Sequence, residues 1–341
     1  MKTQTVSLHQ ETHTLITFQS EAFKATILSY GATLVDLQTP NVKGEFESIV
    51  IRYQTLEDYL KNTKLLGSTV GPYAGRIWPA SMTINKKTWL LDARENTPFL
   101  HSEAANLARK PFVVETLGET FVTLKTTHPS LKAGYPGNLD IWVTYRFEGD
   151  VMTIETAVQS DEDTYVNLAH HSYFNLSGNL KHDITHHRLT LPAASVYRLR
   201  ENGSPEAKIP VKDTPFDFQE ASVLETSLSQ LKKSHTKGLD HPFMLQGDEP
   251  IVLEDPMSKR SLSIRTSYDS VVVYSNNHLS DHVFYPAEKD RLHLGICLET
   301  QHLPNDVHML ENPPSFCPAN TLNVQHTHYR FSLNTKTTEV A

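Results

Sequence analysis

The sequence predicts an all-β protein, a large antiparallel β-sandwich with a few short helices. Three observations support this fold class. Apolar residues recur mostly with the period of two that is typical of strands, and β-branched and aromatic residues are frequent in the same segments. Polar turns separate these segments, and many short strands joined by such turns favour a sandwich.

The strongest strand signal is a hairpin in the middle of the chain. Between residues 141 and 147 every second residue is apolar, so these side chains would share one face. A second β-rich run covers 151–158, and the short connection between the runs contains Gly149. Further strands are expected at 121–127, 261–266 and 270–274.

Helical patterns are few, and we expect two or three short helices. One is expected near 55–60, where Thr55 is a suitable N-cap and acidic residues follow. A second is expected at 222–233, where leucines recur at spacings of four and three. No linker rich in Gly, Ser or Pro divides the chain, so residues 1–341 are predicted to form a single domain. The polar tail, 335–341, is predicted to be frayed.

Composition excludes several classes of protein. The 341 residues carry a formal net charge of -8 with a pI near 6.1, which lacks the basic footprint of a nucleic-acid binder. No apolar run approaches the ~20 residues that span a bilayer, and no signal peptide is recognisable at the start. Cys297 and Cys317 are predicted to be buried free thiols. We therefore expect a cytoplasmic protein with neither membrane nor nucleic-acid partners.

Common cofactor and metal motifs are absent from the sequence. It contains no G-x-G-x-x-G, no phosphate-binding G-x-x-x-x-G-K-[ST] and no H-E-x-x-H, so no cofactor is predicted. His182 and His186 would meet on a helix, with Asp183 and His187 nearby. However, the residues that follow alternate like a strand, so we expect exposed histidines and no metal site.

Four segments combine glycines, histidines and carboxylates in a way that suits a polyol ligand: 71–77, 99–101, 167–176 and 295–301, with 238–243 as a weaker fifth. Glu299 lies in an apolar, strand-like run, where an ionised carboxylate is costly unless it is paired or functional. Spacing alone leaves a structural and a functional interpretation of Glu299 open. His170 and His171 would point to opposite faces of a strand, so only one of them can face a given pocket.

Together these segments resemble the aldose 1-epimerase (galactose mutarotase) family from about residue 71 to 301. The most specific matches are 171–178 (HSYFNLSG) and 298–301 (LETQ), and 75–77, 134–139 and 238–240 agree in order. The resemblance implies a galactose mutarotase-like supersandwich with an open sugar cleft. It also implies that Glu299 is the general base and His171 the general acid. Three further residues would hold the sugar: Arg76, His101 and Asp240.

The chemistry of mutarotation suits these side chains independently. Opening a hemiacetal removes the proton of the C1 hydroxyl and protonates the ring oxygen, and a carboxylate with an imidazolium can do both. Nothing is oxidised, which agrees with the missing cofactor motifs. Tyr173 is expected to offer an apolar surface to one face of the sugar. The expected partner is a small sugar such as galactose or glucose, and the protein is expected to be a monomer or homodimer.

Some positions depart from the family pattern, and alternatives stay open. Ser102 and Glu103 follow His101 where two glycines are common, and His170 and Pro72 replace the usual residue types; these changes bear on sugar preference. A hexose-6-phosphate mutarotase would need extra cations, for which the sequence offers only Arg109-Lys110. A non-catalytic carbohydrate-binding protein would need no opposed Glu299 and His171, and a glycosidase would use two carboxylates, here Glu299 and Asp240.

Overall fold

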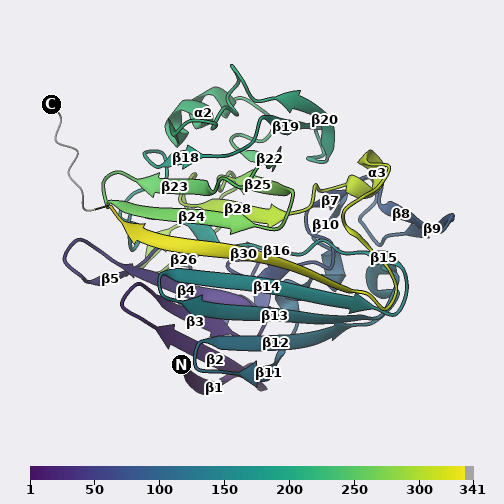
Figure 1. Cartoon of the computed structure of the whole chain (residues 1–341), viewed down its shortest axis with the longest axis horizontal. Helices are drawn as coiled ribbons and strands as arrows, with labels where there is room; N and C mark the ends of the chain where they lie inside the picture. The colour runs from purple at the N-terminus through teal and green to yellow at the C-terminus, as the bar shows by residue number, and fades with distance from the viewer. Residues whose placement is uncertain (335–341) are drawn as a thin grey trace.

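The computed structural model describes residues 1–334 and contains three main antiparallel sheets (Figure 1). The predicted frayed tail lies outside the described residues. The largest sheet has nine strands in the spatial order β11 (Val113–Leu117), β12 (Phe121–His128), β13 (Leu139–Glu148), β14 (Val151–Ser160), β30 (Leu322–Leu333), β24 (Arg260–Thr266), β23 (Ile251–Asp255), β18 (Arg188–Thr190) and β21 (Ser222–Val223).

Two smaller sheets share the opposite layer. The five-stranded sheet consists of β1 (Lys2–Leu8), β2 (Glu11–Gln19), β3 (Lys24–Leu28), β4 (Thr33–Pro40) and β5 (Phe46–Ser48). The six-stranded sheet has the order β17 (Tyr173–Phe174), β28 (Ile296–Gln301), β25 (Ser270–Tyr274), β22 (Asp240–Met244), β19 (Ser195–Leu199) and β20 (Pro205–Pro210). The predicted antiparallel sandwich is therefore confirmed.

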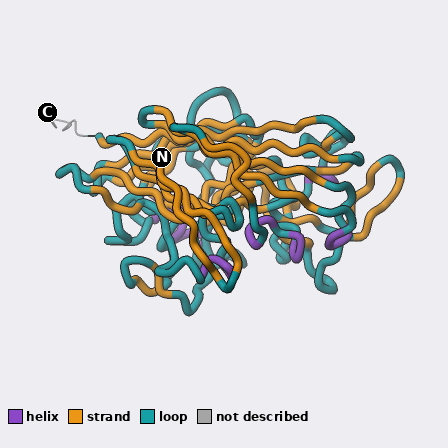
Figure 2. The backbone as a smooth tube through the Cα atoms, turned by 90° about the horizontal axis from the view of Figure 1, so that it is seen from below, coloured by secondary structure: helices purple, strands orange, loops and turns teal. Residues whose placement is uncertain are grey.

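Short elements connect the sheets. Two-stranded pairs are β10 (Phe99–Leu100) with β7 (Arg76–Ile77), β16 (Ala169–His170) with β6 (Thr69–Val70), β15 (Thr164–Tyr165) with β29 (Phe316–Cys317), β26 (Val283–Phe284) with β27 (Glu288–Lys289), and β8 (Ser81–Ile84) with β9 (Lys87–Leu90). The helices are α1 (Asp58–Lys61), α2 (Leu224–Leu231) and α3 (Asp306–Met309), with 3-10 turns η1 (Glu103–Ala105), η2 (Leu107–Arg109) and η3 (Lys132–Gly134). The expected helices correspond to α1 and α2, whereas α3 was not foreseen. In Figure 2 the helices lie in the lower part of the view, away from the long strands at the top.

The core lies between the two layers and follows the predicted alternation. Along β13 the side chains of Ile141, Val143, Tyr145 and Phe147 are buried, while β13 and β14 pair residue by residue as the expected hairpin. Phe18 of the five-stranded sheet stacks on Phe147, with ring centroids 4.3 Å apart. Among the described residues, no helix is long and apolar enough to span a membrane.

A buried ion pair joins the two layers. Arg260 on β24 donates through Nη2 to the Glu47 carboxylate on β5 over 2.7 Å, and Lys181 pairs with the same carboxylate. The guanidinium also donates to the carbonyl oxygens of Leu176 and Thr39. Burial alone would raise the pKa of Glu47, but hydrogen bonds from Lys181 and Arg260 outweigh it and lower that pKa.

The Arg260→Met variant is expected to lower the free energy of unfolding by about 3 kcal/mol, because it leaves a buried carboxylate without its main partner. The lowered pKa of Glu47 means that this stabilisation is present above pH 4.5 and is lost as the pH falls through the folded-state pKa. Denaturant unfolding at two pH values measures both effects. The matched control is Arg330→Met, because Arg330 forms an exposed pair with Asp150 at 3.8 Å and should cost less than about 1 kcal/mol. Equal losses in the two variants would contradict a structural role for the buried pair.

Candidate active site

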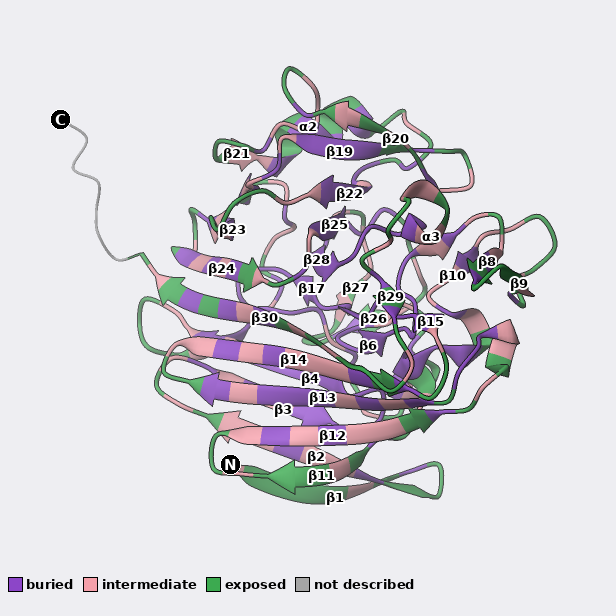
Figure 3. Ribbon diagram, turned by 45° about the vertical axis from the view of Figure 1, so that its right-hand side comes forward, coloured by how far each residue is buried: buried purple, intermediate pink, exposed green. Residues whose placement is uncertain are grey.

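Glu299 lies in the interior of the six-stranded sheet. Its strand, β28, runs between β17 and β25 (Figure 3), and Glu299 is only 3% exposed. Val272 on β25 is opposite Glu299, and Pro242 on β22 is opposite Val272. These three residues therefore form a row on one face of the sheet, and Asp240, two residues before Pro242, shares that face. The row lines one wall of a cavity.

His171 lies beside this carboxylate, in the connection between β16 and β17. Its Nε2 is 3.5 Å from Oε1 of Glu299, and both side chains are buried. The backbone of His171 is held at two points, since its N–H donates to the Ser68 carbonyl and its carbonyl accepts from the N–H of Gly67. The other ring nitrogen, Nδ1, lies 3.6 Å from the sulfur of Cys297. The ring is therefore fixed with Nε2 toward Glu299.

A short β7–β10 pair brings His101 to the same place. The N–H of Gly75 donates to Nδ1 of His101 over 3.1 Å, and the N–H of His101 donates back to the Gly75 carbonyl. Because Nδ1 accepts a hydrogen bond, the neutral ring carries its proton on Nε2. Burial lowers the pKa of His101 well below its usual value, and nearby His171 and Arg76 act in the same direction. His101 is thus a neutral N–H donor, with its ring 5.6 Å from that of His171.

Arg76 and Asp240 form the charged part of the cavity. Nη1 of Arg76 is 3.4 Å from Oδ2 of Asp240, although the two residues are far apart in sequence. Burial raises the pKa of Asp240, and Arg76 partly offsets this effect. The turn between β19 and β20 packs against Arg76 at Gly203, where a Cβ would lie only 2.8 Å from Nε of the arginine. Glycine at this position therefore permits the turn to approach the guanidinium.

Burial moves the pKa values of Glu299 and His171 in opposite directions. It raises the pKa of Glu299 to about 8, with a further contribution from Asp240, and lowers the pKa of His171 to about 4. Between these limits the pair holds one titratable proton, which can reside on the carboxyl or on the ring without changing the net charge. An acid and a base that exchange their roles need this condition.

The structure brings five of the six predicted site residues together. Arg76, His101, Asp240 and Glu299 line the cavity, and His171 lies 3.5 Å from the Glu299 carboxylate and beside the His101 ring. Tyr173 is placed differently from its expected position against the sugar. Its hydroxyl donates to the Lys64 carbonyl and its ring lies 5.2 Å from that of His171, so it supports the histidine and does not line the cavity.

Two further expectations from the sequence are corrected. Glu103 was expected to bear on sugar preference, but its side chain accepts from the N–H of Leu100 and is absent from the cavity lining. Arg109 and Lys110, the candidate phosphate contacts, donate instead to the carbonyl oxygens of Lys61 and Thr127. Neither cation reaches the cavity.

Sequence reasoning missed several lining residues. Gln301 lies two positions after Glu299 on β28, and the period of two could have identified it. Leu199, Gly203 and Pro205 come from the β19–β20 hairpin, which no motif marked. Their position depends on long-range strand pairing, which a single sequence does not reveal.

Two groups of side chains could be considered for a metal ion. His101, His171 and Glu299 offer ligand atoms within 4.8 Å of one another. In the second group, His187 is fully buried beside His182 and Asp255, which corrects the expectation of exposed histidines. The N–H of Leu176 donates to Nε2 of His187, so the neutral ring carries its proton on Nδ1. His187 therefore has no free lone pair to offer a metal ion between His182 and Asp255.

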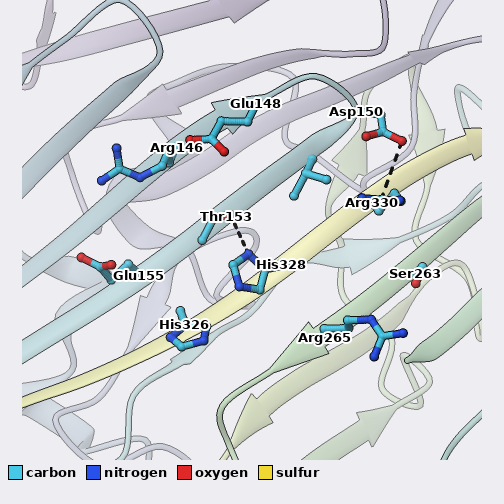
Figure 4. Close-up of a pocket in the computed structure, with 11 residues that line it drawn as sticks. Arg146, Glu148, Asp150, Thr153, Glu155, Ser263, Arg265, His326, His328 and Arg330 are labelled. Atoms are coloured by element: carbon cyan, nitrogen blue, oxygen red, sulfur yellow. Dashed lines mark hydrogen bonds and ion pairs between the residues drawn. The ribbon is translucent and has the colours of Figure 1, made fainter. Parts of the chain in front are cut away.

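A larger groove lies elsewhere, on the outer face of the nine-stranded sheet (Figure 4). It is lined from β13, β14, β24 and β30 by Arg146, Glu148, Asp150, Val151, Thr153, Glu155, Ser263, Arg265, His326, His328 and Arg330. Three arginines face three carboxylates, so neither charge dominates. The groove contains none of the predicted site residues.

We expect the Glu299→Gln variant to be more stable than the wild type at alkaline pH. The folded protein holds the Glu299 proton to a pKa of about 8, against 4.5 for the unconstrained group, so stability falls as the pH rises between these values. The glutamine cannot ionise, and the variant should exceed the wild type by about 2–4 kcal/mol near pH 8.5 and match it near pH 4.5. Denaturant unfolding measures the difference, with Glu155→Gln on the outer face as control. A less stable Glu299→Gln protein at high pH would mean that pairing with His171 outweighs burial.

Comparisons with known proteins agree with this geometry. A family model described as aldose 1-epimerase matches residues 14–326. Galactose mutarotase from Mus musculus is 29% identical over 326 residues, which cover 92% of this chain and 93% of the relative. Aldose 1-epimerase from Haemophilus influenzae is 31% identical over 301 residues, covering 85% and 87% respectively.

Solved structures show the same fold. The GalM/aldose epimerase homologue from C. elegans matches with a TM-score of 0.86 at 23% identity, over 94% of this chain and 99% of that one. Galactose 1-epimerase from Lactobacillus acidophilus NCFM gives a TM-score of 0.84 at 23% identity, over 97% and 99%. Since the family model extends across nearly all of the described sandwich, this chain belongs to the aldose 1-epimerase family.

Proposed function

We propose that this protein is an aldose 1-epimerase (mutarotase) that interconverts the α and β anomers of a free hexose such as galactose or glucose. One observation carries the proposal. A buried carboxylate on a cavity wall, Glu299, lies 3.5 Å from the imidazole of His171. The pair can therefore take one proton from a bound sugar and return another at a neighbouring atom.

The reaction follows from the positions of this acid and base. Glu299 accepts the proton of the C1 hydroxyl while His171 donates a proton to the ring oxygen, and the C1–O5 bond breaks to give the open-chain aldehyde. Rotation about the C1–C2 bond presents the other face of the carbonyl. The C5 hydroxyl then attacks C1, His171 takes up its proton, and Glu299 returns a proton to the new C1 hydroxyl. Protons and electrons balance, and no redox cofactor takes part.

The other cavity residues are suited to hold the sugar. Arg76 and the N–H of His101 can donate to hydroxyls or to the ring oxygen, and Asp240 can accept from hydroxyls. Tyr173 packs against the His171 ring. We assign these residues to binding and orientation, because orienting the C1 hydroxyl against Glu299 is what allows concerted transfer.

The alternative functions have less support. Among the described residues that line the cavity, Arg76 is the only Lys or Arg, which leaves a hexose 6-phosphate without further cationic partners. A purely binding protein would have no reason to retain a buried, costly carboxylate next to an imidazole. A glycosidase would need a second carboxylate with its own role, whereas Asp240 is paired with Arg76.

We also place the protein in the cytoplasm. Cys297 and Cys317 are both buried and unpaired, as their sequence context predicted. Free thiols of this kind are typical of a reducing compartment.

Polarimetry of freshly dissolved α-D-galactose and α-D-glucose tests the proposal. The wild type should accelerate the change in rotation, and Glu299→Gln and His171→Asn should each reduce kcat by about 10²–10⁴-fold, because each removes one proton-transfer group. Glu155→Gln and His326→Asn, on the outer face, are matched controls and should retain full activity. A wild type without effect on any free hexose would refute mutarotation.

The pH profile gives a second prediction. Below pH 4 the pair takes up a second proton and Glu299 no longer serves as a base, while above pH 8 the pair loses its last proton and His171 no longer serves as an acid. The value of kcat/KM should therefore form a bell with limbs near pH 4 and pH 8. Stopped-flow polarimetry or coupled oxidation of the β anomer can measure the profile. A rate that is flat across both limits would contradict proton transfer by this pair.

A further inference from the structure

Gln301 has a buried amide that the described protein leaves unpaired. The residue ends β28, two positions after Glu299 and on the same face of the sheet, and it lines the same cavity. It is 0% exposed, yet neither Nε2 nor Oε1 of its side chain has a hydrogen-bond partner among the described residues. Burying an amide without partners is unfavourable, so the unpaired amide lowers the stability of the protein unless a ligand forms hydrogen bonds with it.

The space beside the amide is kept open by Gly75. This glycine has a positive φ of 78°, and a Cβ there would lie 2.6 Å from the Pro304 ring and 3.3 Å from Nε2 of Gln301. A larger residue at this position would therefore fill the space next to the amide. With glycine, Gln301 lines the same cavity as Glu299, Gly75 and His101.

The chemistry of the amide fits a sugar hydroxyl. A carboxamide donates and accepts, and a hydroxyl does the same, so the two can pair in either sense. Gln301 is the only carboxamide among the described residues that line this cavity. Side chains two residues apart on one strand are separated by about 7 Å, which is comparable to the width of a pyranose ring.

We propose that Gln301 is a substrate-binding residue, which hydrogen-bonds a hydroxyl of the sugar other than that on C1 and thereby helps to select among aldoses. The inference rests on the proposed mutarotase function. Gln301 takes no part in proton transfer, and its effect is on binding and orientation of the ring.

A purely structural role for the Gln301 side chain has no support. Its backbone carbonyl accepts from the Ser270 hydroxyl and its backbone pairs with β25, and neither contact involves the amide. Replacing an unpaired buried amide with an apolar group of similar size should leave stability unchanged or increased. A loss of sugar binding together with unchanged or higher stability would therefore be specific to a binding role.

The experiment compares the wild type with Gln301→Leu, and with the near-isosteric Gln301→Met in case leucine packs poorly. Both should keep or raise the melting temperature. Both should also lower kcat/KM for galactose or glucose by about 10-fold, mainly through KM. Gln230→Leu, at an exposed position of α2, is the matched control and should change neither quantity.

Deoxy analogues that each lack one hydroxyl complete a double-mutant cycle. For the analogue that lacks the contacted hydroxyl, the wild type and Gln301→Leu should have equal kcat/KM. A wild type that is inactive on every hexose would overturn the proposed function and this inference with it. An active wild type whose kinetics are unchanged in both Gln301 variants would overturn this inference alone. An equal reduction of kcat/KM by Gln301→Leu for every deoxy analogue would also overturn this inference alone.

Discussion

The desolvation of one carboxylate is the constraint on which the site depends. Glu299 occupies an interior strand, where solvent cannot stabilise its charge, so its pKa rises to about 8. An imidazole placed in an equally dry environment has its pKa lowered, which makes it a ready acid when it is protonated. Neutral pH falls between the two transitions, so the pair keeps one proton under ordinary conditions. The sheet supplies the enclosure that creates this condition.

The surrounding fold maintains that enclosure from several directions. The hydroxyl of Tyr145, on the nine-stranded sheet, donates to the Ala32 carbonyl, and its oxygen lies 2.9 Å from Nε2 of His170. Burial lowers the pKa of His170 to about 3, so this neighbour of His171 stays neutral and adds no competing charge. The two adjacent histidines thus divide their tasks as strand geometry requires. His170 contacts Tyr145 of the nine-stranded sheet, and His171 faces the carboxylate.

The sequence allowed much of this arrangement to be predicted, because the signals were local. Alternation identified the β13–β14 hairpin, and an acidic residue in an apolar run marked Glu299. Tyr173 was misplaced because its hydroxyl is taken by the Lys64 carbonyl, more than a hundred residues away, and such a partner leaves no trace in the sequence. His187 was expected at the surface for a similar reason, since its burial comes from strands that are remote in the chain. The hairpin that covers Arg76 was missed because only strand order brings it there.

Strand order also separates two properties of the enzyme. The proposed acid and base come from β28 and from the connection before β17, near one end of the six-stranded sheet, whereas the turn that packs against Arg76 joins β19 to β20 at the other end. Because β20 is an edge strand, its turn can change in length or composition without breaking the hydrogen bonds that hold the acid and base. Related proteins can therefore diverge in the sugars they accept while keeping the same chemistry, and an engineer seeking a new specificity would begin at this hairpin.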